Sequence, residues 1–129
     1  MTATTASDPV VLDSSGWLEY LTDGTKAEAF APYLEGDRTI VVPTMVIYEV
    51  RKILTLKKSR TLADLFISDV LRRTIAAFDE VLALKSADLS VECKLAMADA
   101  IIYATARHFQ VNLITSDSHF ANLPGVTIL

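Results

Sequence analysis

The sequence has few of the features that stabilise secreted proteins or direct them to membranes. Cys93 is the single cysteine, so the chain forms no internal disulfide and has no cysteine-based zinc site. No apolar run reaches the roughly 18 residues of a membrane span, and the start of the chain lacks the basic and apolar segments of a signal peptide. We therefore expect a cytoplasmic protein with no membrane partner.

Low-complexity segments, internal repeats and linkers are also missing from the 129 residues. We predict one folded domain over residues 9–129, preceded by a flexible tail over residues 1–8. The hydrophobic share is 51% and the mean hydropathy is +0.35. Both values are high for so small a domain, which predicts that some apolar surface is buried in an oligomer or against a partner.

The formal net charge of −4 argues against a general nucleic-acid binder. The charge is uneven, however, because residues 51–73 contain seven basic and two acidic residues. This segment is either a contact for a phosphate backbone or a solvated helix face.

Short apolar runs alternate with segments of helical periodicity, which indicates an α/β fold. We expect a mainly parallel sheet of four to five strands, flanked by helices, because one or two helices separate successive strands. The expected strands cover residues 9–13, 39–42, 74–78, 112–115 and 126–129. The expected helices cover residues 14–21, 25–34, 43–54, 61–73, 79–87 and 96–109.

Some helix boundaries can also be predicted. Ser14 or Ser15 is expected to cap the first helix, and Pro43 and Thr44 suit the first turn of the third. Pro32 lies within the second helix and is expected to kink or shorten it.

Four acidic residues occupy positions that could share one site. Asp13 ends the first strand and Asp117 lies two residues beyond Thr115, at the end of the fourth. Both therefore border the crevice outside the carboxyl ends of the strands, where open α/β sheets bind ligands. Glu49 interrupts the apolar stripe of the third helix, and Asp99 lies in the first turn of the last.

Such a group of carboxylates needs raised pKa values or a cation. Oxygen ligands without cysteine or histidine suit Mg²⁺ or Mn²⁺, and a site of this kind can hydrolyse phosphodiesters. Each acid also has a structural explanation. Asp13 can cap a helix, and Asp99 can be an acid near a helix N-terminus, where the helix dipole favours it. Asp117 can occupy a turn, and Glu49 can pair with a basic residue that follows it.

The chain resembles PIN-domain ribonucleases, and most closely the VapC toxins of toxin–antitoxin pairs. The resemblance covers residues 10–129. It is carried by VVLDSSGWLEYL with Asp13, VPTMVIYEV with Glu49, MADAIIYATA with Asp99, and LITSDSHF with Thr115 and Asp117.

The resemblance implies an endoribonuclease that depends on Mg²⁺ or Mn²⁺, with the four acids as metal ligands and catalytic residues. Ser14 or Ser15 and Thr115 would support the metal or its water. It also implies an RNA substrate, a small antitoxin that places a basic side chain among the acids, and a homodimer; residues 53–66 are the expected partner surface. Gly16 and Gln110 depart from the usual pattern, and neither removes an acid.

Two other functions were weighed. A PIN-like module that binds RNA or protein without cleaving it usually lacks one of the acids, whereas all four are present here. A phosphohydrolase that uses Asp13 as a covalent nucleophile would need a second aspartate two residues later, where Ser15 stands. For Trp17 and Tyr48 we expect packing in the core or the crevice and not base stacking. His119 could hydrogen-bond in the site, but a structural role in the turn with Phe120 is preferred, and His108 is expected at a helix end.

Overall fold

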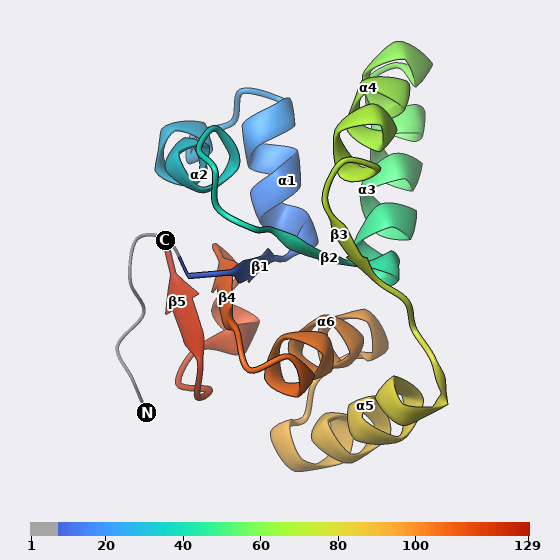
Figure 1. Cartoon of the computed structure of the whole chain (residues 1–129), viewed down its shortest axis with the longest axis vertical. Helices are drawn as coiled ribbons and strands as arrows, with labels where there is room; N and C mark the ends of the chain where they lie inside the picture. The colour runs from blue at the N-terminus through green and yellow to red at the C-terminus, as the bar shows by residue number, and fades with distance from the viewer. Residues whose placement is uncertain (1–7) are drawn as a thin grey trace.

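A computed structural model describes residues 8–129 (Figure 1). The predicted tail over residues 1–8 therefore lies outside the described residues except for Asp8. The strands are β1 (Val10–Leu12), β2 (Val41–Pro43), β3 (Thr74–Ala76), β4 (Asn112–Thr115) and β5 (Val126–Ile128). The helices are α1 (Ser14–Leu21), α2 (Ala27–Leu34), α3 (Thr44–Lys57), α4 (Arg60–Val70), α5 (Glu80–Cys93) and α6 (Met97–His108), followed by a 3₁₀ turn, η1 (Ser118–Phe120).

The strands confirm the predicted parallel α/β architecture. β4 pairs with β1 on one side and with β5 on the other, while β2 pairs with β3, and every pairing is parallel. A parallel bridge between Val10 and Ile40 joins the two groups, so the spatial order is β3–β2–β1–β4–β5. Parallel strands end at the same edge of a sheet, and this edge receives the residues that follow β1 and β4.

Helices cover both sides of the strands as three packed pairs, α1 with α2, α3 with α4, and α5 with α6. In Figure 1, α1 and α2 lie on one side of β1 and β4, and α6 lies on the other with α5 outside it. Both central strands are therefore buried except at the half-buried Asn112, and they are apolar apart from Asn112 and Thr115. Within residues 8–129, no helix is both long and apolar enough to cross a membrane.

Several predicted boundaries are corrected. The cap of α1 is Asp13, not Ser14 or Ser15, which are the first two helical residues. α5 continues to Cys93 instead of ending near residue 87. The polar residues after Ala87 therefore belong to the helix and not to a loop. The strand predicted over residues 74–78 ends at Ala76, and Pro43 ends β2 and precedes α3.

Pro32 and Gly16 have local explanations. α2 runs through Pro32 and ends at Leu34, where the sequence predicts its end, so the proline does not shorten the helix. Gly16 is needed because α2 packs closely on α1: a β-carbon at this position would lie 2.7 Å from Cε1 of Phe30. The departure at Gly16 from the pattern that the resemblance implies is thus explained by its contact with Phe30.

Candidate active site

The neighbouring strands β1 and β4 bring Asp13 and Asp117 to one edge of the sheet. Leu12 lies beside Ile114 in the register of this pair. Asp13 follows the end of β1, and Asp117 lies two residues beyond the end of β4. These positions are as the sequence predicts.

Asp13 is fixed at the centre of this edge. It is buried, with 4% of its surface exposed. Its Oδ1 accepts hydrogen bonds from the Ser15 hydroxyl at 2.7 Å and the Gly16 amide at 3.1 Å, and its Oδ2 accepts one from the Thr115 hydroxyl at 2.6 Å. Burial raises the pKa of Asp13, and these three hydrogen bonds oppose the rise. The carboxylate is both a helix cap and a rigidly oriented acid.

Hydroxyl groups connect the remaining segments of the site. Ser14 Oγ donates to Glu49 Oε1 at 2.7 Å, which ties α1 to α3. Ser15 Oγ accepts from Ser116 Oγ at 3.1 Å, and Thr115 Oγ1 accepts from the backbone amide of Asp117 at 2.9 Å. The three hydroxyl residues predicted to support the site therefore each contact one of the acids.

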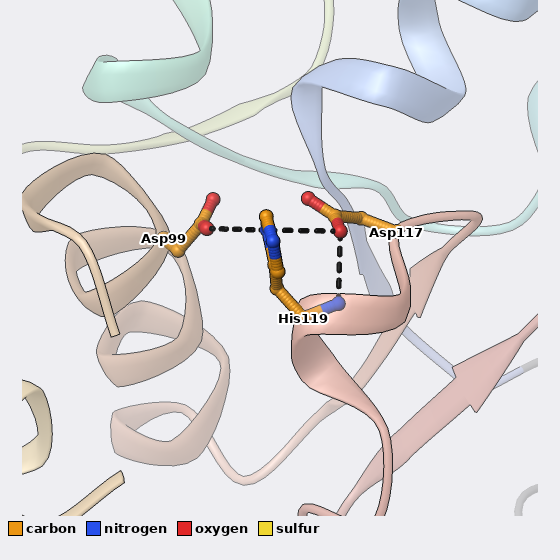
Figure 2. Close-up of side chains that lie close together, drawn as sticks. All are labelled: Asp99, Asp117 and His119. Carbon is orange, nitrogen blue, oxygen red and sulfur yellow. Dashed lines mark hydrogen bonds and ion pairs between the residues drawn. The ribbon is translucent and has the colours of Figure 1, made fainter. Parts of the chain in front are cut away.

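Asp99, Asp117 and His119 form the tightest part of the site. One ligand atom from each lies within 4.8 Å of the others. Figure 2 shows the imidazole of His119 between the two carboxylates, with Nδ1 3.2 Å from Asp117 Oδ1 and 3.8 Å from Asp99 Oδ2. Asp117 also caps η1 by accepting from the His119 amide at 2.9 Å.

The pKa of Asp99 is affected by the charges of the other three acids. Burial raises the pKa of Asp99, and the negative charge of Asp117 raises it further. The charges of Glu49 and Asp13 act in the same direction, while His119 lowers it. Glu49 and Asp13 lie outside the tightest cluster but near enough for their charges to affect Asp99.

Two side chains near these acids had alternative predictions. For His119 a turn role was preferred over a role in the site, and its imidazole lies between two carboxylates; its position two residues after Asp117 was the available signal. For Tyr48 packing in the core or in the crevice was expected; 60% of it is exposed, which excludes the core, and Lys52 Nζ lies 5.3 Å from its ring centroid. By contrast, Trp17 is fully buried, and its ring packs edge-on against Phe66.

Part of the basic segment over residues 51–73 is used within the fold. Arg51 forms an ion pair with Asp64 at 3.0 Å, and Arg73 pairs with Asp69 at 3.3 Å. Glu49 accepts a hydrogen bond from Ser14, while its neighbour Arg51 is directed to α4. These pairs favour a helix-stabilising role for the two arginines.

The donor set suits a hard divalent cation. Carboxylate oxygens are the preferred ligands of Mg²⁺ and Mn²⁺, and these oxygens come from the residue after β1, from α3, from α6 and from the segment after β4. Burial raises the pKa of Asp99, and the like charge of Asp117 adds to the rise. A bound cation would relieve this crowding.

Comparisons with known proteins agree with this architecture. The profile of the PIN domain family matches residues 10–126. No curated protein sequence matches the chain. A toxin–antitoxin complex from Klebsiella pneumoniae superimposes with a TM-score of 0.76 at 23% identity, over 92% of this chain and 95% of that one.

Two further solved structures show the same fold at lower identity. A DNA-bound VapBC from Salmonella typhimurium has a TM-score of 0.74 at 13% identity, covering 94% of this chain and 96% of that one. A sarcin-ricin loop cleaving VapC toxin from Mycobacterium tuberculosis has a TM-score of 0.72 at 13% identity, covering 91% and 96% respectively. At these identities the likeness establishes the arrangement of helices and strands.

Proposed function

Because the chain belongs to the PIN domain family, we propose that it is a metal-dependent endoribonuclease and the toxin of a type II toxin–antitoxin pair. The cluster of Asp99, Asp117 and His119 carries this proposal, together with Asp13 and Glu49, whose charges act on Asp99. Among similar structures, one is a toxin–antitoxin complex and another is a sarcin-ricin loop cleaving toxin. These two proteins support the proposed substrate class and partner.

In this proposal Asp13, Glu49, Asp99 and Asp117 are the catalytic acids and hold Mg²⁺ or Mn²⁺. When bound, such a cation supplies a nucleophilic water at neutral pH and polarises the phosphoryl group. Thr115 and Ser15 orient Asp13 through the hydrogen bonds described above, and Ser14 orients Glu49. The protein thus contributes a pre-arranged set of negative charges.

The proposed partners follow from the same chemistry. A cytoplasmic RNA supplies the phosphodiester, and a small antitoxin blocks the site by placing a basic side chain among the acids. A guanidinium or ammonium group would relieve the repulsion by Asp117 that, after burial, raises the pKa of Asp99. A second copy of the chain completes the proposed assembly, since the exposed apolar side chains are numerous for a monomer.

Cleavage of RNA by the purified chain tests the activity. We expect cleavage with Mg²⁺ or Mn²⁺, none with a chelator, and a loss of at least about a hundredfold in Asp13→Asn and Asp99→Asn. Glu28→Gln, which removes an exposed acid of α2, is the matched control and should cleave normally. RNA binding without metal-dependent cleavage would instead identify a binding module, and full activity of Asp99→Asn would exclude the proposed site.

A further inference from the structure

His119 belongs to the tightest cluster of the site, yet it is not one of the four acids. Asp99, Asp117 and His119 each offer one ligand atom, and these three atoms lie within 4.8 Å of one another. Asp99 comes from α6, whereas Asp117 and His119 come from the segment after β4. Figure 2 shows the imidazole between the two carboxylates. A nitrogen atom therefore lies among the oxygen atoms that are proposed to hold the cation.

The backbone around η1 determines where this imidazole lies. Asp117 caps η1 by accepting a hydrogen bond from the backbone amide of His119 at 2.9 Å. The next residue, Phe120, is fully buried, and its ring centroid is 6.5 Å from that of Tyr103 on α6. The chain is thus held on both sides of His119, by the cap and by the core. Its side chain is 75% exposed, so an ion from solvent can reach the ring.

The distances from the imidazole to the two carboxylates match those between ligands of one metal ion. Nδ1 of His119 lies 3.2 Å from Oδ1 of Asp117 and 3.8 Å from Oδ2 of Asp99. Two ligand atoms that are each about 2.1 Å from a metal lie about 3.0 Å apart at a right angle and about 4.2 Å apart when opposite. Both observed distances fall between these values. One ion can therefore bind the imidazole together with each carboxylate.

The turn does not account for the position of the imidazole. The hydrogen bond that closes the turn comes from the backbone amide of His119, which any residue except proline could supply. Within residues 8–129, Nδ1 donates no hydrogen bond to either carboxylate, although it lies close to both. The remaining structural explanation is an ion pair of a protonated imidazole with the two acids, in which Nδ1 could not bind a metal.

A nitrogen ligand changes which cation the site prefers. Mg²⁺ is bound through oxygen atoms and keeps much of its water, whereas imidazole is typically a ligand of transition metals. Mn²⁺ is the transition metal that carboxylates also suit. Carboxylates alone do not distinguish Mg²⁺ from Mn²⁺, but an additional imidazole does, because only Mn²⁺ gains substantially from it.

We infer that His119 is a further metal ligand of the proposed site and that its Nδ1 makes the site select Mn²⁺ over Mg²⁺. This inference rests on the proposed metal site, to which it adds a nitrogen ligand beside the four acids. Two ligands, Asp117 and His119, then come from a single turn of the chain. The turn after β4 thereby determines the choice of metal.

Pulsed electron paramagnetic resonance of Mn²⁺ bound to the purified full chain tests the inference without RNA. The method detects coupling between the electron spin of Mn²⁺ and the nucleus of a ligand nitrogen. We expect this coupling in the wild type and its loss in His119→Gln, with Mn²⁺ still bound by the acids. The sequence has two histidines, so His108→Gln, at the end of α6, is the matched control and should keep the coupling. Circular dichroism verifies that both variants are folded.

Calorimetric titration with each cation measures the selectivity. His119→Gln should weaken Mn²⁺ binding by about tenfold or more and Mg²⁺ binding by about twofold at most. Bound Mn²⁺ without nitrogen coupling in the wild type, or an equal loss of affinity for both ions in the variant, would overturn the inference and leave the acids as the metal site. A wild type that binds neither ion would overturn both proposals. Intact RNA in the presence of nitrogen-coupled Mn²⁺ would instead contradict the nuclease activity alone.

Discussion

Replacing Asp99 by asparagine should stabilise the protein while abolishing its proposed activity. The side chain of Asp99 is 24% exposed, and a carboxylate oxygen of Asp117 lies within 4.8 Å. Burial is the main cause of the raised pKa of Asp99, and the charge of Asp117 is the next. Asparagine keeps the shape of the side chain and removes its charge, so both unfavourable effects disappear.

The size of the effect follows from Coulomb's law. Two unit charges 4.8 Å apart repel by about 0.9 kcal/mol at the dielectric constant of water and about 3.5 kcal/mol at an effective value of 20. His119 offsets part of this repulsion. We therefore expect a gain of about 1 to 3 kcal/mol in the free energy of unfolding, which corresponds to a rise of roughly 4 to 12 °C in melting temperature.

The gain should depend on pH in a defined direction. An acid whose pKa is higher in the folded state than in the unfolded state destabilises the fold as it loses its proton. Below the ordinary pKa of 3.8, Asp99 is protonated in both states, so wild type and variant should differ little. The difference should grow as pH rises through the raised pKa of Asp99 and remain constant above it.

Thermal unfolding with a chelator, followed by circular dichroism, measures this gain, and repetition with Mn²⁺ tests the role of Asp99 as a ligand. A cation that binds the folded protein should raise the melting temperature of the wild type and have much less effect on the variant. Glu28→Gln should show neither change. An Asp99→Asn protein that melts at or below the wild-type temperature in chelator would refute the argument from charge repulsion.

Three other substitutions test the supporting contacts. Thr115→Val leaves Asp13 without one of its hydrogen bonds and should cost about 1 to 3 kcal/mol of stability, measured by urea unfolding, with slower RNA cleavage. Gly16→Ala should cost about 1 to 3 kcal/mol by crowding Phe30; adding Phe30→Leu should recover much of this loss, and equal melting of both variants would contradict the packing explanation. Ser14→Ala removes the hydrogen bond to the glutamate of α3 and should reduce cleavage severalfold with a change in stability below about 1 kcal/mol.

The strands and the positions of the acids could be predicted from the sequence because they depend on short-range rules. An apolar run followed by Asp13, and another followed by Asp117, fixes a shared edge once the strands are parallel and adjacent. Because helices separate successive strands, the strands are expected to pair in parallel. The fold class could therefore be predicted almost entirely from the hydrophobic periodicity of the sequence.

The errors concern properties that depend on tertiary packing. The exposure of Tyr48 depends on which side of α3 meets the core; Val46, Val50 and Leu54 form that side, and Tyr48 lies off it. The close approach that requires Gly16 depends on the distance between α1 and α2. The position of His119 depends on η1, a single 3₁₀ turn that Asp117 caps. A single turn is too short to show hydrophobic periodicity, so the sequence pattern does not predict it.

Structural and functional explanations of an acid do not exclude each other in this protein. Asp13 caps α1 and also borders the proposed metal site, so the cap predicted as an alternative is present. The same hydrogen bonds that stabilise the helix orient the carboxylate, and loss of a cap costs about 0.5 to 2 kcal/mol. Ionisation of either Asp13 or Asp99 opposes folding, because burial raises the pKa of both carboxyl groups. The two acids differ in what offsets burial: three residues donate hydrogen bonds to Asp13, whereas the imidazole of His119, 3.8 Å from Asp99, lowers the pKa of Asp99.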